Sequence, residues 1–123
     1  IAYAAFMNST DLGEIDVPDS VIAIGGHAFD DTAWLEKQEA GNVYLEHIYY
    51  TYKGTISANE VLEIKDGTTV IADTAFEDQE LMTSISLPEG MVSIGNAAFF
   101  NCLSLTEISV IGEIHRRSRF CTV

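Results

Sequence analysis

Two segments of the chain, 15–29 (IDVPDSVIAIGGHAF) and 85–99 (ISLPEGMVSIGNAAF), carry isoleucine, proline, Ile-Gly and Ala-Phe at identical offsets. A third segment, 62–76, keeps the second isoleucine, the alanine and the phenylalanine, and residues 5 and 6 add another Ala-Phe pair. The phenylalanines of these Ala-Phe pairs fall at 6, 29, 76 and 99, so their separations are 23, 47 and 23 residues. This spacing predicts a 23-residue unit with one 24-residue insertion, and a fixed period of that length indicates a solenoid of stacked coils.

Each unit begins with a short apolar series of the type Leu-x-x-Ile-x-Val, as in Leu12, Ile15 and Val17. The alternation predicts a short strand whose apolar residues point inward, and equivalent strands of successive units are expected to stack in parallel. Pro18 and Pro88 are expected to close the strand, because proline has no N–H to donate to a neighbour.

A second extended stretch follows and ends in a glycine, Gly25 or Gly95, which we expect to permit a backbone turn. The Ala-Phe pair comes next and is expected to point inward. The four phenylalanines then form one column along the axis, stacked at the strand spacing of roughly 4.8 Å. We therefore expect these four rings to pack in the core.

Residues 36–61 break the period. Two runs rich in β-forming residues, 43–45 and 48–52, flank Glu46 and His47. This pattern predicts an irregular inserted coil that contains a hairpin with its turn at those two residues.

The run Leu-x-x-Ile-x-Leu-Pro-x-x-x-x-x-Ile-Gly-x-x-Ala-Phe-x-x-Cys, which residues 82–102 match with Met82 in place of leucine, resembles the BspA-type class of leucine-rich repeats. The resemblance covers 1–35 and 62–110. It implies a β-rich solenoid, a right-handed superhelix of about five 23-residue coils with one irregular coil. Residues 1–110 are thus expected to form the solenoid and 111–123 a tail outside the repeat.

The sequence departs from the repeat pattern at several positions. Ala72 stands where the other units have glycine, and Lys65 replaces the proline. The position of Cys102 is serine, threonine or glutamine in the other units, which predicts a ladder of small polar residues pointing inward. Because Ile1 falls within a repeat, we expect the chain to be part of a longer array.

Composition limits the classes of partner. The chain has 19 acidic and 6 basic residues and a formal net charge of −13, which argues against nucleic acid and anionic lipid as partners. No apolar run reaches 18 residues, so no membrane insertion is expected. Three of the six bases, Arg116, Arg117 and Arg119, lie in the tail, where we expect them to be solvated.

The sequence shows no catalytic or metal-binding motif. His27, His47 and His115 are widely spaced, no Cys-x-x-Cys is present, and neither a nucleophile elbow nor a phosphate-binding glycine loop occurs. Acidic turns at 30–31, 66 and 77–78 lack the spacing of known calcium loops. We therefore expect neither catalytic residues, nor metal, nor cofactor, and a protein that is not an enzyme.

Two surfaces are candidates for binding. Outward positions of the first strand in each unit are acidic or hydroxyl-bearing and are expected to form columns on one sheet: Glu14, Asp16, Glu63, Ser84, Ser86, Glu107 and Ser109. The second candidate is an aromatic patch within the insertion: Tyr44, Tyr49, Tyr50 and Tyr52.

The resemblance also implies a function. BspA-like proteins include surface adhesins that bind host matrix proteins or other cells, so the expectation is an interaction module of a cell-surface or secreted protein whose partner is an extracellular or host protein. Two alternatives stay open: a structural spacer array, and a carbohydrate-binding face that uses the tyrosines at 44–52.

Overall fold

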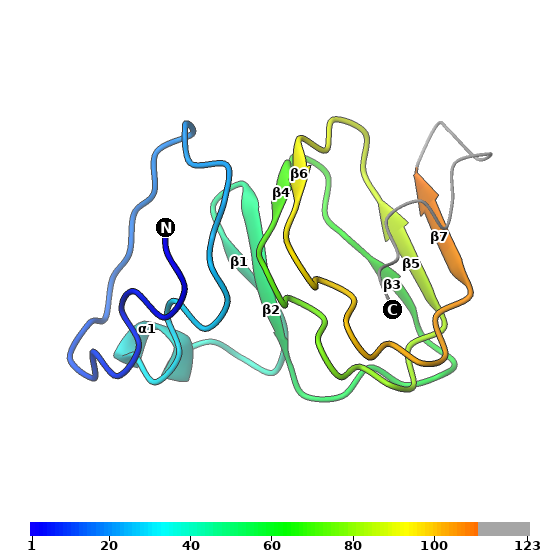
Figure 1. Cartoon of the computed structure of the whole chain (residues 1–123), viewed down its shortest axis with the longest axis horizontal. Helices are drawn as coiled ribbons and strands as arrows, with labels where there is room; N and C mark the ends of the chain where they lie inside the picture. Colours follow the sequence, from blue (N-terminus) through cyan, green and yellow to red (C-terminus); the bar gives the residue numbers. More distant parts are fainter. Residues whose placement is uncertain (111–123) are drawn as a thin grey trace.

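A computed structural model describes residues 1–110 of the chain (Figure 1). Within this range the chain forms one short helix and seven strands. In chain order they are α1 (Ala33–Glu36), β1 (Gly41–Leu45), β2 (Ile48–Lys53), β3 (Val61–Glu63), β4 (Val70–Ile71), β5 (Ser84–Leu87), β6 (Ser93–Ile94) and β7 (Glu107–Val110). The predicted tail, 111–123, with its three arginines and His115, lies outside the described residues.

The first strands of the last three coils form a parallel sheet in the order β3-β5-β7. Leu62 pairs with Ile85 and Ile85 with Ile108, so each step along the sheet advances the chain by 23 residues. Pro88 follows directly on β5, as predicted. The 23-residue period of the sequence therefore equals the offset between paired residues in this sheet.

The second strands lie in another sheet, of order β1-β2-β4-β6. Tyr49 in β2 pairs with Ile71 in β4, and Ile71 pairs with Ile94 in β6, all in parallel, whereas β1 pairs with β2 antiparallel. The hairpin with its turn at Glu46 and His47 is confirmed. Strand β2 takes the place of a repeat strand, and β1 is an additional strand at the edge of the sheet (Figure 1).

A ladder of backbone hydrogen bonds joins the turns that carry the Ala-Phe pairs. In the first two coils the N–H groups of Ala4, Phe6 and Asn8 donate to the carbonyls of residues 26, 28 and 30, at 2.8–3.0 Å. The same bonds recur from Thr74, Phe76 and Asp78 to residues 96, 98 and 100. Each ladder holds two neighbouring coils in register.

The strand expected at 12–17 is wrong, because that segment carries no strand assignment in the structure. The second stretch, 21–25, also lies outside the sheets. A strand requires a hydrogen-bonded neighbour, and β1 occupies the edge of the sheet nearest to the N-terminal coils. The N-terminal coils, residues 1–40, are held instead by the turn ladder and by side-chain packing.

Gly25 and Gly95 are needed for close approach and not, as expected, for a turn. Their φ angles lie outside the left-handed range, but a Cβ atom at either position would collide with the backbone of the preceding coil, at Tyr3 or at Asp73. Ala72, at the same position of another unit, directly follows strand β4, and its side chain is buried in the core of the N-terminal coils.

The single column of phenylalanines is also wrong. Phe6 stacks on Phe29 at 5.5 Å and Phe76 on Phe99 at 5.4 Å, both with nearly parallel rings. Between the two pairs lies strand β2: Tyr49 stacks on Phe76 at 4.8 Å, while Tyr50 meets Phe29 edge to face at 5.7 Å. The aromatic file continues through the insertion on tyrosine rings.

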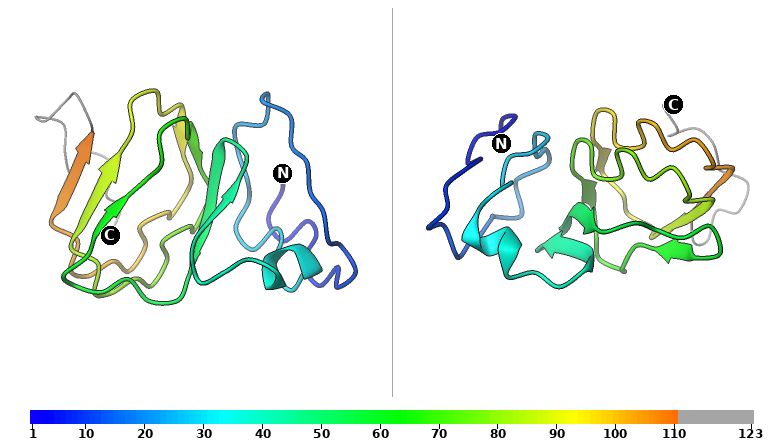
Figure 2. Two further views of the ribbon diagram at one scale, coloured as in Figure 1. Left: turned by 180° about the vertical axis from the view of Figure 1, so that it is seen from behind. Right: turned by 90° about the horizontal axis from the view of Figure 1, so that it is seen from below.

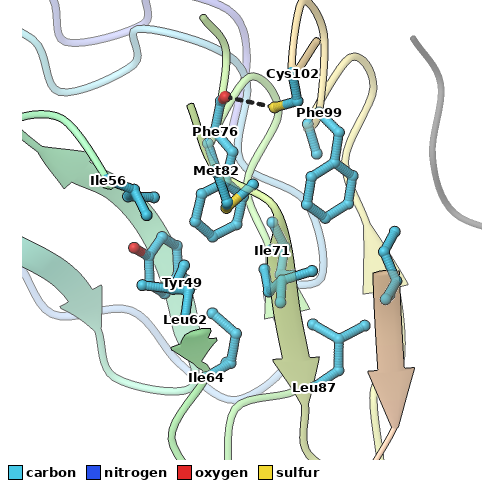
Figure 3. Packing of buried hydrophobic residues seen from close by; sticks show 14 residues of the cluster. Tyr49, Ile56, Leu62, Ile64, Ile71, Phe76, Met82, Leu87, Phe99 and Cys102 are labelled. Atoms are coloured by element: carbon cyan, nitrogen blue, oxygen red, sulfur yellow. Dashed lines mark hydrogen bonds between the residues drawn. The ribbon is translucent and has the colours of Figure 1, made fainter. Parts of the chain in front are cut away.

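Strand β2 consequently divides the interior into two clusters. Ile48 and Tyr50 belong to the core of the N-terminal coils. Tyr49 belongs to the core of the C-terminal coils, as Figure 3 shows. Cys102 is buried in the latter, as predicted, and its Sγ–H donates to the carbonyl of Phe76 at 3.1 Å. Residues 48–50 of this strand are thus buried on both of its faces.

Candidate functional site

The outward face of the sheet β3-β5-β7 is the most regular exposed surface among residues 1–110. Alternate residues of each strand, Leu62, Ile85 and Ile108, are buried in the core. Their neighbours point outward and align in two columns across the sheet: Val61, Ser84 and Glu107 in one, and Glu63, Ser86 and Ser109 in the other. Five of the seven predicted face residues thus lie together on one sheet. Figure 2 shows the three strands of this sheet side by side.

The other two predicted face residues do not belong to this sheet. Glu14 and Asp16 are exposed, but they lie in the extended segment of the N-terminal coils that pairs with no strand. The hairpin stands between that segment and β3 in the chain fold (Figure 1). The one continuous face expected from the repeat is therefore divided into a sheet face and a separate acidic pair.

The sheet face carries negative charge and hydroxyl groups. Glu63 and Glu107 are exposed, and the three serines are half-buried. Lys65, two residues after Glu63, is directed to the hairpin, because its Nζ lies 4.3 Å from the centre of the Tyr44 ring. The face offers hydrogen-bond acceptors and anionic groups to a partner, in a chain whose net charge is already −13.

The predicted aromatic patch is not a surface. Tyr49 and Tyr50 are buried, at 0% and 4% exposure, and hold the two cores together. Burial raises the pKa of both phenols far above the ordinary value. For Tyr50 the carboxylate of Asp30, which accepts its hydroxyl at 2.8 Å, raises the pKa further.

Tyr44 and Tyr52 are half-buried and also packed against the protein. The Tyr44 ring meets Tyr49 edge to face at 5.1 Å, and its hydroxyl accepts the backbone N–H of Lys65 at 2.9 Å. Burial raises the Tyr44 pKa, and the bond from Lys65 opposes that shift. Sugar-binding platforms require exposed ring faces, so this arrangement does not favour the carbohydrate reading.

A polar hollow of about 230 Å³ lies between the turn at 27–30, the end of β2 and the turn at 73–79. Its wall includes His27 and Asp30 from one side and Asp73, Glu77 and Asp78 from the other. Sequence reasoning did not find it, because alanine or threonine occupies the His27 position in the other units and no local motif marks the site.

The carboxylates of this hollow are mostly engaged within the protein. Asp30 accepts from His27 Nδ1 at 2.7 Å and from Tyr50, and Asp73 accepts the N–H of Asn96 at 2.7 Å. Asp78 accepts the side-chain amide of Asn101 at 2.9 Å. Throughout residues 1–110, no group of three or more histidine, cysteine or acidic residues is placed to hold a metal ion.

The two described histidines, His27 and His47, contact only groups of the fold itself. His27 contacts Asp30, Glu77 and the Tyr3 ring, and His47 contacts the Val21 carbonyl and Asp19. Across the described part of the chain, neither ring is hydrogen-bonded to a hydroxyl or thiol. The pairing of nucleophile and base that hydrolytic catalysis needs is thus not built from these rings.

Comparison with known proteins agrees with the repeat. The family model for the BspA type leucine-rich repeat region matches residues 1–121 in six copies. No curated protein and no solved structure matches the chain. Among the described residues, no helix has the length and apolar character needed to span a bilayer.

Proposed function

Since the chain belongs to the BspA-type leucine-rich repeat family, we propose that it is a non-enzymatic protein-interaction module of a cell-surface or secreted protein, acting in adhesion or in binding to a host protein. Proteins of this family are generally surface-associated repeat proteins that interact with other proteins, and the family is generally non-enzymatic. The partner is an extracellular protein.

The observation that carries this proposal is the sheet β3-β5-β7. A backbone held in register by a 23-residue period presents two ordered columns of outward side chains, while the inward ones form a dry core. The positions of Glu63 and Glu107 are therefore fixed by the fold, without loops. Rigid elements of this kind position contact residues with little entropic cost on binding.

The size of the face predicts weak binding by this chain alone. Three strands spaced by about 4.8 Å, each with a rise of about 3.3 Å per residue, present on the order of 200 Å². A stable interface buries about 800 Å² on each partner. The partner must therefore also contact adjoining turns, or further coils must extend the face.

Charge reversal on the face tests the proposal. Purified chain is applied to an array of extracellular-matrix proteins and to a glycan array, and affinities for any matrix protein it binds are measured by surface plasmon resonance. Because the face offers carboxylates to a partner, the double substitution Glu63→Lys and Glu107→Lys should weaken that binding by about tenfold or more. Circular dichroism should show an unchanged fold.

The matched control is the double substitution Glu14→Lys and Asp16→Lys. It changes the net charge of the chain by the same amount at exposed positions outside the sheet. Equal loss of affinity in both variants would show a general charge effect and would remove the sheet face as the site. Binding to neither array would favour the spacer alternative, and binding to glycans alone would contradict the protein-interaction proposal.

A further inference from the structure

The N-terminal coils meet the rest of the molecule along one boundary, which we call the seam. On one side lie Ile24 and Phe29, and on the other lie Ile48, Tyr50 and Val70, all packed in one buried cluster. Two backbone N–H groups donate across this seam: that of Asp73 to the carbonyl of Ile24 at 3.0 Å, and that of Phe29 to the Tyr50 hydroxyl at 2.9 Å. The seam replaces the regular coil-on-coil ladder at this point.

His27 lies at the seam on the side of the N-terminal coils. Its Nδ1 is 2.7 Å from a carboxylate oxygen of Asp30, and since an ionised carboxylate only accepts, Nδ1 carries the proton. Its Nε2 is 3.9 Å from a carboxylate oxygen of Glu77, across the seam. In the neutral ring Nε2 therefore presents a lone pair to a negative charge.

His47 repeats this arrangement from the opposite side. Its Nε2 is 2.8 Å from the Val21 carbonyl oxygen, which accepts only, so Nε2 carries the proton. Its Nδ1 is buried without a hydrogen-bond partner among residues 1–110 and lies 4.0 Å from a carboxylate oxygen of Asp19, across the seam. Again the unprotonated nitrogen faces an acid on the other part of the molecule.

We propose that His27 and His47 form a proton-dependent latch that fastens the N-terminal coils to the hairpin and the C-terminal coils. Proton uptake turns each lone pair into an N–H donor with a positive charge facing a carboxylate, so a repulsive contact becomes an ion pair at each side of the seam. The latch is therefore closed when both imidazoles carry a second proton and open when they do not.

The charges around each ring determine the strength of the latch. His27 faces Asp30 on its own turn and Glu77 across the seam, and Asp73 lines the same hollow. His47 faces Asp19 across the seam and follows Glu46 on its own turn. Asp19 is fully exposed, so water screens the His47–Asp19 contact more than the His27–Glu77 contact. The His27–Glu77 contact is therefore expected to contribute more to the stability of the closed latch.

Amide hydrogen exchange across the seam tests the latch. Protection factors of the Asp73 and Phe29 amides are measured by NMR at pH 7.5 and 5.0 and divided by that of the Phe76 amide, which donates to Ala98 within the C-terminal coils. This ratio removes the effect of pH on overall stability. It should rise by about two- to fivefold at pH 5.0.

Removing the carboxylates separates the latch from other effects of the histidines. The double substitution Glu77→Gln and Asp19→Asn should abolish the rise, as should His27→Gln with His47→Gln. Glu89→Gln, at an exposed position in the turn after β5, should leave it intact. An unchanged ratio in the native chain would overturn the proposal. A rise that persists in the Glu77→Gln and Asp19→Asn variant would also overturn it. This variant keeps both histidines, so it tests the proposal even if the histidine variant does not fold.

Discussion

The Tyr50 hydroxyl takes the place of a backbone carbonyl. In regular coils the N–H of the core phenylalanine donates to the next coil, from Phe6 to Ala28 and from Phe76 to Ala98. Phe29 has no such coil beyond it, and its N–H donates instead to the Tyr50 hydroxyl, which in turn donates to Asp30. A single side chain thus satisfies a buried donor at the point where the repeat is interrupted.

Tyr50→Phe should therefore destabilise the protein by about 1–3 kcal/mol, because the buried N–H of Phe29 loses its acceptor. Urea unfolding followed by circular dichroism measures the change. Tyr52→Phe is the matched control, since the Tyr52 hydroxyl has no hydrogen-bond partner among residues 1–110, and it should have little effect. Equal stability of the two variants would contradict the role given to Tyr50.

Alkaline pH should unfold the protein through the same residues. Burial raises the pKa of Tyr49 and Tyr50 in the folded chain, whereas an unfolded tyrosine ionises near pH 10. Their contribution to stability is complete below pH 10 and is lost as the pH rises toward the folded pKa values, because only the unfolded state releases the protons. Urea midpoints measured from pH 8 to 11 should fall above pH 10, and the fall should be smaller in Tyr49→Phe. A flat profile would contradict the buried assignment.

At the scale of elements, each turn that carries an Ala-Phe pair uses two left-handed residues. One position is held by Asn8, Asp31, Asp78 and Asn101, the residue types that adopt this conformation most readily. The other is held by Ala4, His27, Thr74 and Ala97, with φ between 52° and 60°. The left-handed conformation is unfavourable for alanine and for the β-branched threonine, so the turns that carry these residues store backbone strain at this position.

Ala97→Gly should relieve this strain and stabilise the protein by about 0.5–1 kcal/mol, because glycine adopts positive φ without a steric penalty. The neighbouring Ala98→Gly is the control: Ala98 is buried and its φ is not positive, so that substitution should destabilise the protein. Thermal unfolding distinguishes the two. A decrease in melting temperature for both would show that the conformation at residue 97 is not strained.

The hairpin is tied to its surroundings by long side chains. Lys53, at the end of β2, donates to the carbonyls of Leu35 and Gln38 at 3.1 and 2.8 Å and so satisfies the end of α1. Gln79 donates to the Gly54 carbonyl and accepts the N–H of Ile56, both at the exit of the hairpin. Gln79 occupies the position of Cys102 in the next unit, and its greater length reaches the displaced loop.

On the scale of the whole molecule, the sequence period predicts how the repeating coils pair, but not how the inserted hairpin packs between them. The 23-residue offset predicted the registers Leu62–Ile85–Ile108 and Ile71–Ile94, and aromatic and β-branched residues predicted the hairpin. Neither the offset nor the residue types could show that the first residues of β2 would be buried on both faces. Tyr49 and Tyr50 reach the two aromatic stacks from strand positions, where periodicity predicts no core phenylalanine.

The candidate surface was also predictable only where the repeat is uninterrupted. Outward residues of β3, β5 and β7 align because their coils are consecutive. Glu14 and Asp16 obey the same pattern in sequence, but sheet membership depends on a neighbouring strand, and the hairpin removes that neighbour. Pairing across an insertion is a property of three-dimensional packing that a local pattern does not contain.

An aromatic file passes through the insertion on tyrosine rings, and the most direct test of this packing is a map of ring-to-ring nuclear Overhauser effects. We expect cross-peaks between the rings of Phe6 and Phe29, of Phe29 and Tyr50, of Tyr49 and Phe76, and of Phe76 and Phe99. Direct cross-peaks between Phe29 and Phe76, with none from either tyrosine, would show that the coils stack without the hairpin and would contradict the aromatic file through Tyr49 and Tyr50.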